Sequence, residues 1–354
     1  MDTFDRKLHF EFKTNQQILN LISEIDLFRG KWEHLENQNI TILKELKNIT
    51  TIQSIGSSTR IEGATLSDTE IKKLICDLKI NKLENRDEQE VIGYYDVLEL
   101  ILENSQDIKL TENYIMQLHT LLLKYSTKDS GQKGAYKKVS NKVVANYPDG
   151  TQKIIFNTTD PYLVQKEMNE LINWTNENID NKEYHPLLIL GLFLYEFLSI
   201  HPFHDGNGRL SRLLTTLLLI KLDYAYVKYI SFEHLIENRK EQYYTALMEC
   251  QKNRNTKYEH IDQWMVFFLN SLKLLTIKLN LKISNTESKP IYLNERQQKI
   301  KSFLFKNQPC KIGDISKYLV DISINTLKKD LQYLVKNKII NKIGERKSTI
   351  YTVS

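Results

Sequence analysis

The chain has 354 residues, of which 41% are hydrophobic and 26% charged, and a net charge of +5, as expected of an ordinary globular protein with two or three domains. Its three cysteines, Cys76, Cys250 and Cys310, are too widely spaced for a metal-binding motif or a disulfide framework, so we expect a reducing, cytoplasmic location. The N-terminus lacks the apolar segment of a signal peptide, and the most apolar run, Leu187 to Ile200, is too short to span a membrane.

The first hundred residues have the apolar periodicity of helices. Apolar side chains recur every three or four residues in 18–25 and again in 40–52, and Gly63 follows the second run. A further helix is expected from Glu88 to Glu103. We therefore predict an N-terminal helical region over residues 1–110.

The segment from 111 to 285 is predicted to combine helices with one β-hairpin. A helix begins at Thr111 and ends near Tyr125, and β-branched residues on both sides of Pro148-Asp149-Gly150 predict a hairpin over 137–156. The remaining helices are expected near residues 161–178, 186–200, 210–222, 239–251 and 260–281. These elements make the fold class mainly α.

The loop between two of these helices, residues 201–209, has the features of a phosphate site. The run Gly206-Asn207-Gly208 allows backbone N–H groups to turn toward one point, and the N-terminus of the next helix adds a positive dipole end. His201, at the other edge of the loop, can accept a hydroxyl proton.

Three charged side chains complete this loop. Asp205 can hold Mg²⁺ between phosphate oxygens. Arg209 and Arg212 are three residues apart on one helix face, where their guanidinium groups can both reach the phosphates. The loop therefore predicts a site for a nucleotide and its metal ion.

The sequence His201-Pro-Phe-His-Asp-Gly-Asn-Gly-Arg209 resembles the signature HPFx(D/E)GN(G/K)R of the Fic/DOC family and matches every fixed position. The resemblance covers about residues 110–285. It implies a Fic-type helical bundle whose hairpin, the flap, holds an extended target segment by strand addition. It also implies a nucleotidyltransferase that moves AMP from Mg·ATP to a Ser, Thr or Tyr hydroxyl of a target protein, which is AMPylation.

The same resemblance assigns roles to individual residues. His201 would be the catalytic base and Asp205 the ligand of Mg²⁺. The nucleotide-binding residues would surround the phosphates and the adenine, and are Gly206, Asn207, Gly208, Arg209, Arg212, Tyr243 and Tyr244. Arg209 would contact the leaving pyrophosphate and Arg212 the γ-phosphate. Tyr243 and Tyr244 fit a packed helix in the core equally well.

An inhibitory motif is expected before the core. Ser58-Thr-Arg-Ile-Glu62-Gly63 resembles the sequence (S/T)xxxE(G/N) found N-terminal to many Fic domains. Ser58 and Glu62 share a helix face, and Gly63 is placed to end the helix. The resemblance implies that Glu62 pairs with Arg212 and excludes the γ-phosphate.

The C-terminal part carries the positive charge of the chain. Residues 291–354 hold 13 Lys+Arg and 5 Asp+Glu, whereas the rest holds 36 and 39. After a linker at 286–290, three short helices and two strands predict a winged helix-turn-helix domain over 291–354. The second helix of the helix-turn-helix motif begins at Ser323 and would be the recognition helix. It would present to DNA the side chains of Asn325, Thr326, Lys328 and Lys329.

Several alternatives stay open at this point. The enzyme could use another nucleotide, or it could remove AMP, because the inhibitory glutamate supports that reaction in some relatives. The chain could instead be a DNA-binding regulator whose Fic core senses a nucleotide. The winged helix could bind protein rather than DNA, the protein modified could be this chain itself, and the chain could form a homodimer.

Overall fold

The computed structural model separates into two compact units, Met1–Ser284 and Asn285–Ser354. The described residues are 3–77, 83, 85–128, 131–146, 152–287, 293–337, 339–344 and 349–353, with the backbone alone for 142–146, 152–155 and 285–287. Each unit has its own hydrophobic core.

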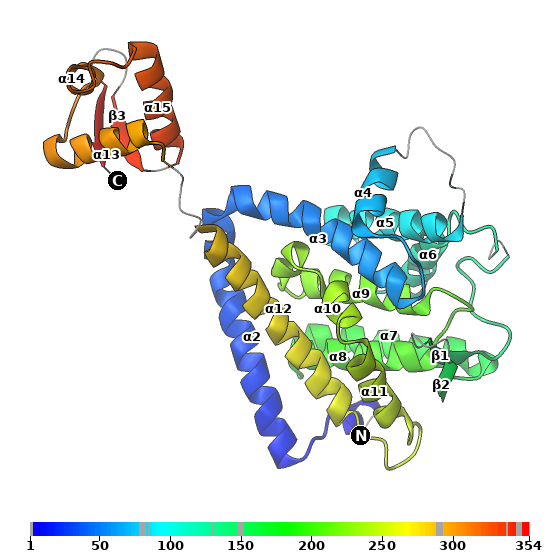
Figure 1. Ribbon diagram of the computed structural model, residues 1–354. Coiled ribbons are helices and arrows are strands. Elements are labelled where there is room, and N and C mark those ends of the chain that lie inside the picture. The colour runs from blue at the N-terminus through cyan, green and yellow to red at the C-terminus, as the bar shows by residue number, and fades with distance from the viewer. Residues whose placement is uncertain are drawn as a thin grey trace. The chain divides into compact units, whose positions relative to one another are not determined.

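The larger unit is a bundle of helices with one small sheet (Figure 1). Its elements in chain order are α1 (Thr3–Lys7), α2 (Phe12–Gln38), α3 (Ile40–Ile61), α4 (Asp68–Asp77), α5 (Arg86–Asn104), α6 (Glu112–Leu122), β1 (Lys142–Asn146), β2 (Gln152–Asn157), α7 (Pro161–Asn181), α8 (Pro186–Ile200), α9 (Asn207–Lys221), η1 (Ala225–Tyr229), α10 (Phe232–Glu237), α11 (Lys240–Gln251) and α12 (Asp262–Glu287). The predicted mainly α fold class is confirmed.

One continuous hydrophobic core runs through this unit, from Leu8 near the N-terminus to Ile283 in α12. Helix α8 lies deep in it, because every residue from 189 to 200 is buried. It packs between α7 and α9 and therefore holds its C-terminal end, where the signature loop begins, at a fixed place. Residues of the predicted 1–110 and 111–285 regions share this core, so the two regions form one unit of packing.

Several helix boundaries differ by a few residues from those expected, and two of these differences bear on the signature loop and on the linker. Helix α9 begins at Asn207 rather than Leu210, because Gly206 adopts a left-handed φ of 80° as its N-cap and frees the chain to turn directly into the helix. Helix α12 continues past Leu281 to Glu287, so residues 286 and 287 of the predicted linker are helical. Residues 288–290 of that linker lie outside the described part of the chain.

The predicted hairpin is present. Strands β1 and β2 pair antiparallel, and the register shifts by one residue between Val143 and Val144, which marks a β-bulge. The expected turn, Pro148-Asp149-Gly150, lies outside the described residues. The hairpin places Asn141 immediately before its first strand and Thr158 immediately after its second.

Helix α12 is, among the described residues, the helix long and apolar enough to cross a membrane by length and composition. However, 56% of its apolar window is buried inside the fold. It lies beside α2 in Figure 1, and an ion pair between Lys273 and Glu24 (2.7 Å) joins the two helices. Trp264 and Phe268 of α12 are buried in the core, as in a helix that packs within a protein.

The smaller unit contains α13 (Glu295–Asn307), α14 (Ile312–Tyr318), α15 (Ile324–Lys336) and the antiparallel strands β3 (Ile340–Ile343) and β4 (Ile350–Val353). Its core is formed by Leu304, Ile315, Leu327 and neighbouring apolar residues. Asn294 begins α13 with a reciprocal capping box to Gln297. The expected order of three helices followed by two strands is confirmed.

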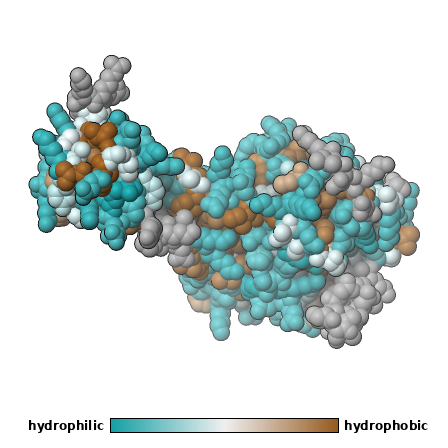
Figure 2. Space-filling model, turned by 45° about the horizontal axis from the view of Figure 1, so that its top comes forward, coloured by the Kyte–Doolittle hydropathy of each residue, from teal (hydrophilic) through white to brown (hydrophobic). Residues whose placement is uncertain are grey.

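The surface of the molecule is mostly hydrophilic on the face shown in Figure 2, with scattered apolar patches on both units. The exposed large apolar side chains of the smaller unit include Phe305, Val320 and Ile324. Single exposed apolar residues of this kind are common on protein surfaces.

Candidate functional site

The loop between α8 and α9 reverses the chain through two left-handed residues. His201 ends α8 with a φ of 52°, and Gly206 begins α9 with a φ of 80°. A left-handed backbone is uncommon for a residue with a side chain, so His201 depends on its surroundings to hold this conformation. The turn brings the C-terminal end of α8 and the N-terminal end of α9 to the same cavity.

Asn207 braces this turn from inside. Its Oδ1 accepts a hydrogen bond from the Phe203 N–H (2.9 Å), and its Nδ2 donates to the Phe203 carbonyl (2.7 Å). Both groups of the amide are therefore committed to the loop backbone. The expected contact of Asn207 with phosphates is accordingly limited to its backbone N–H.

His119 of α6 supports the loop from outside, and sequence patterns did not identify it. Its ring stacks on Phe203 with a centroid distance of 3.8 Å and an interplanar angle of 9°. The Gly134 N–H donates to Nδ1 (2.9 Å), so Nε2 carries the proton and donates to the Asp205 carbonyl (3.0 Å). His119 thus fixes the backbone next to the glycine nest.

The cavity at this loop has a volume of about 240 Å³. It brings together residues from α3, β2, α8, α9, α11 and the loop, and is lined by Glu62, Phe156, Leu198, His201, His204, Asp205, Gly206, Asn207, Gly208, Arg212, Tyr243, Tyr244 and Leu247. All the expected catalytic, metal-binding and nucleotide-binding residues except Arg209 are in this lining, as is the expected inhibitory Glu62.

Arg209 is not among the residues that line the cavity. Its buried guanidinium contacts Asp205 Oδ1 (3.2 Å) through Nη2 and Glu90 Oε2 (3.1 Å) through Nη1. Glu90, on α5, also binds Arg86 (2.7 Å). The spacing of three residues predicted that Arg209 and Arg212 would reach the phosphates from one helix face. In the structure the Arg209 guanidinium pairs instead with Glu90, a buried carboxylate on α5.

The Asp205 carboxylate is kept charged by its neighbours. Burial raises the pKa of this carboxyl, but Arg209, the Gly206 N–H and Arg86 outweigh burial and hold the pKa below its usual range. Arg86 lies 3.4 Å away across the cavity edge. A single ionised carboxylate beside a glycine nest fits Mg²⁺, which takes one or two protein carboxylates together with phosphate oxygens and water.

Arg212 is buried, and its Nε and Nη2 both bind the last turn of α3. Its Nε donates to Ser58 Oγ (2.8 Å), and its Nη2 donates to the Ser58 carbonyl (2.9 Å) and to Glu62 Oε1 (2.8 Å). A Cβ on Gly208 would lie 2.2 Å from Glu62 Oε1, so this carboxylate sits directly on the glycine nest. The two residues of the expected inhibitory motif therefore both contact Arg212.

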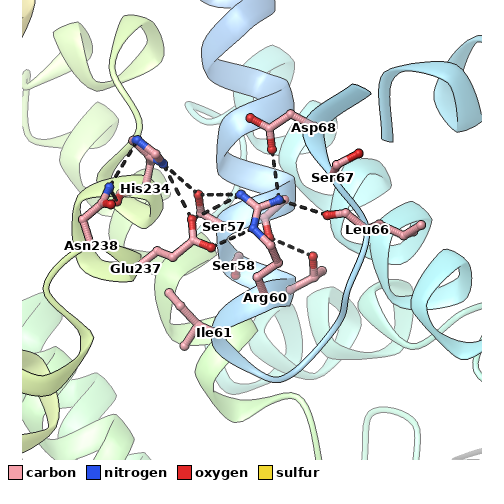
Figure 3. Close-up of polar contacts among 12 residues, drawn as sticks. Ser57, Ser58, Arg60, Ile61, Leu66, Ser67, Asp68, His234, Glu237 and Asn238 are labelled. Atoms are coloured by element: carbon pink, nitrogen blue, oxygen red, sulfur yellow. Dashed lines mark hydrogen bonds and ion pairs between the residues drawn. The ribbon is translucent and has the colours of Figure 1, made fainter. Parts of the chain in front are cut away.

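The end of α3 is held on its other side by Arg60 (Figure 3). The guanidinium binds Glu237 of α10 (2.7 Å), Asp68 of α4 (3.0 Å) and the Leu66 carbonyl (3.0 Å). Ser57, one turn earlier, contacts His234 Nδ1 (3.3 Å). We call these contacts the Arg60 clamp, and they fix the helix turn that presents Glu62.

His201 lines the cavity but is enclosed by protein on its other sides. Burial and the nearby Lys137 ammonium lower the pKa of His201 to about 4, against the smaller opposing effect of Glu62 and Asp205. The ring is therefore neutral at pH 7, the state that a proton acceptor requires.

Tyr243 and Tyr244 line the cavity from α11, as expected of an adenine-side wall. Tyr243 is also part of the aromatic core, where its ring makes edge contacts with Tyr244 (5.3 Å) and Trp264 (5.7 Å). Tyr243 therefore lines the cavity and packs in the core at the same time, so only part of its ring is open to a ligand.

Comparison with known proteins identifies the region that carries this site. Residues 109–219 match the model of the Fic/DOC family, so this part of the chain is a Fic/DOC domain. The protein adenylyltransferase Fic of Aedes aegypti is 27% identical over 186 residues, which are 51% of this chain and 34% of that protein. The chain thus spans about a third of the length of this curated relative.

Solved structures show the same fold. A Fic family protein from Desulfovibrio desulfuricans G20 has a TM-score of 0.66 at 22% identity, over 98% of both chains. A Fic domain containing signaling protein from Bacteroides thetaiotaomicron has a TM-score of 0.60 at 25% identity, over 77% of this chain and 99% of that one. The fold expected from the signature loop is therefore confirmed.

The low pKa of His201 predicts a pH-dependent loss of stability. Between its usual pKa of 6.5 and the folded value of about 4, the unfolded chain binds a proton that the folded chain does not. The free energy of unfolding of the wild type should therefore fall, relative to His201→Gln, by about 2 kcal/mol between pH 7 and pH 5. Urea denaturation of both proteins at the two pH values measures this difference, and equal losses would show that His201 titrates normally.

Proposed function

We propose that this chain is a protein adenylyltransferase that transfers AMP from Mg·ATP to a Ser, Thr or Tyr hydroxyl of a target protein. The observation that carries the proposal is the common cavity of a neutral imidazole, His201, and an anion-binding nest at the N-terminus of α9. The Fic/DOC domain over residues 109–219 and the similarity to a protein named adenylyltransferase support it.

The phosphates would bind where backbone and side-chain positive charge converge. The N–H groups of Gly206, Asn207 and Gly208 begin α9 and add its dipole to the nest. Arg212 lies in the same cavity wall and would contact the γ-phosphate. Arg209, which points to Asp205 and Glu90, would act by holding the Asp205 carboxylate rather than by binding pyrophosphate.

Asp205 would be the protein ligand of Mg²⁺. When bound, this ion would neutralise charge on the phosphate oxygens. The described residues contain no group of three metal-ligating side chains, which agrees with a metal held mainly by the nucleotide. The low pKa of Asp205 keeps the carboxylate ionised for this purpose.

In the transfer, the target hydroxyl oxygen would form a bond to the α-phosphorus while the bond from that phosphorus to the pyrophosphate oxygen breaks. His201 would receive the hydroxyl proton. Tyr243 and Tyr244 would contact the nucleoside from α11. The β1–β2 hairpin would bind an extended segment of the target protein by strand addition.

We also propose that Glu62 inhibits the enzyme in this state. Its carboxylate occupies the space above the Cα of Gly208 and contacts Arg212, which is the region that the terminal phosphates would occupy. The remaining cavity, about 240 Å³, is smaller than the roughly 300–1,000 Å³ of typical small-molecule sites. Both an excluded anion and a reduced volume would keep ATP from a productive position.

Removal of Glu62 is expected to increase transfer. Glu62→Gly frees Arg212 and the nest, so incorporation of labelled AMP from Mg·ATP should rise on the order of 10- to 100-fold, and His201→Ala in the same background should abolish the gain. Mass spectrometry of the products identifies the modified side chain, and parallel reactions with the other nucleotides test base preference. A folded Glu62→Gly protein without any gain would contradict the inhibitory role.

The Arg60 clamp predicts a second, weaker route to activation. Arg60→Met removes the contacts to Glu237 and Asp68, so the turn that carries Glu62 should leave the nest more often. Transfer should increase roughly five- to tenfold. The Arg60→Met, Glu62→Gly double variant should be no faster than Glu62→Gly alone, because Arg60 acts through Glu62. Arg29→Met removes an arginine whose ion pair is to Asp26 on its own helix, α2; it is the matched control and should leave the rate unchanged.

DNA binding by the smaller unit is a second candidate function. We propose that this unit is a winged helix whose α15 meets DNA, because Asn325, Lys328 and Lys329 are exposed at its N-terminal half, with Thr326 half-buried beside them. The face is extended along the helix by exposed Lys336. The excess of basic residues in 291–354 supports the same interpretation.

A salt titration with a matched pair of variants tests this candidate. Lys328→Ala/Lys329→Ala should weaken binding of a DNA duplex by the full chain and lower the slope of log K against log salt by up to about 2. Lys72→Ala/Lys73→Ala, which removes two consecutive exposed lysines from α4, should leave both unchanged. Equal effects of the two pairs, or no salt-dependent binding, would favour a protein partner instead.

A further inference from the structure

The two ends of the β1–β2 hairpin are tied together next to the cavity. Asn141 precedes β1 and Thr158 follows β2. The Asn141 Oδ1 accepts hydrogen bonds from the Lys137 ammonium (2.9 Å) and from the Thr158 hydroxyl (2.6 Å). Lys137 is buried, and its ammonium also donates to the Ile200 carbonyl (3.1 Å) at the end of α8. We call these residues the hairpin root.

The hydrogen-bond partners fix which way the Asn141 amide faces. Because the Lys137 ammonium can only donate, the atom that it contacts must be Oδ1, and the other end of the amide must be the NH₂ group. This NH₂ donates to the Phe203 carbonyl (3.0 Å), which accepts only, and it also lies 3.1 Å from His201 Nδ1. A flipped amide would set its oxygen against that carbonyl and its NH₂ against the Lys137 ammonium.

A second amide reaches the same ring nitrogen. Asn207 Nδ2 lies 3.2 Å from His201 Nδ1, and its orientation is fixed by the Phe203 N–H and carbonyl. Nδ1 therefore faces two N–H donors and accepts from them. A neutral imidazole has one proton, which must then reside on Nε2.

We propose that Asn141 is a positioning residue for His201, and that the hairpin root and Asn207 together hold the neutral ring with its proton on Nε2. The proposal rests on the function proposed above only for its kinetic consequence. This tautomer is a second restraint on the reaction, independent of Glu62. A ring nitrogen that already carries a proton cannot accept another, so a base that takes the hydroxyl proton at Nε2 must carry its own proton on Nδ1.

The proton balance shows what this restraint does. Transfer forms the bond from the hydroxyl oxygen to the α-phosphorus, breaks the bond to pyrophosphate and delivers one proton to Nε2, so the product ring has protons on both nitrogens. While Asn141 and Asn207 both contact the ring, a proton on Nδ1 would face two NH₂ groups. One of these amides must move before the ring can act as a base.

Asn141 is the amide that the hairpin can move. Asn207 is buried within the turn, whereas Asn141 is attached directly to β1. A target segment that adds to the hairpin as a strand would shift its root, and the Asn141 NH₂ would leave Nδ1. Binding of the target would thus be coupled to the proton position on the catalytic ring.

The tautomer is measured directly by ¹⁵N NMR of the full chain labelled on histidine nitrogens, with His201→Gln to assign the ring. The wild type should show an unprotonated Nδ1 and a protonated Nε2. Asn141→Asp keeps an acceptor for Lys137 and Thr158 but replaces the NH₂ with an oxygen that can accept from a protonated Nδ1, and should move the proton there. Asn141→Leu removes one of the two donors without adding an acceptor, and should shift only part of the ring population to a protonated Nδ1.

A protonated Nδ1 in the wild type, or an unchanged tautomer in folded Asn141→Asp, would overturn the proposal, and neither result depends on any activity. The kinetic arm uses the Glu62→Gly background. There Asn141→Asp should raise kcat on the order of tenfold at unchanged KM for ATP, since a wrong histidine tautomer costs a catalytic triad up to about 10⁴-fold. A switched tautomer with unchanged kcat would overturn the claimed effect on the reaction. Absence of transfer in Glu62→Gly itself would count against the proposed function, and the NMR result would then decide whether Asn141 positions the His201 ring.

Discussion

The structure of the larger unit depends on a buried cation that needs an anion. The Arg212 side chain is only 3% exposed, and an unpaired charge at such a depth costs several kcal/mol. Ser58 and Glu62 supply the acceptors, and they do so from α3, which is 150 residues away in the chain. This contact joins α3 to α9, and it adds a buried ion pair to the hydrophobic core that the regions before and after residue 110 share.

On the proposal that Glu62 inhibits the enzyme, the same need gives the site two states. Arg212 would be paired either by Glu62 or by a phosphate, because both anions would occupy the nest above Gly208. The balance between them would depend on how firmly the last turn of α3 is held. The Arg60 clamp holds this turn through residues that do not line the cavity, so the proposed inhibition would depend on the packing around α3 as well as on Glu62.

Around the signature loop, the residues that position the chemistry are far from it in sequence. His119 holds the Asp205 carbonyl, Glu90 binds Arg209, and Lys137 and Asn141 contact the end of α8 and the His201 ring. Such outer contacts fix the orientation of functional side chains and the position of their protons.

A similar buried pairing occurs at Glu196 on α8, where Lys7 of α1 and Arg254 both bind the carboxylate.

The sequence by itself determined the features that depend on local spacing. Apolar periodicity identified the helices, the β-branched run identified the hairpin, and the loop His201–Arg209 identified the Fic/DOC domain and its cavity. Only the tertiary structure decided that Arg209 pairs with Glu90, that α12 extends to Glu287 at the start of the expected linker, and that Asn141 reaches His201. The physical reason is that helical spacing fixes which residues share a face, whereas the partner each face meets is set by packing between distant segments.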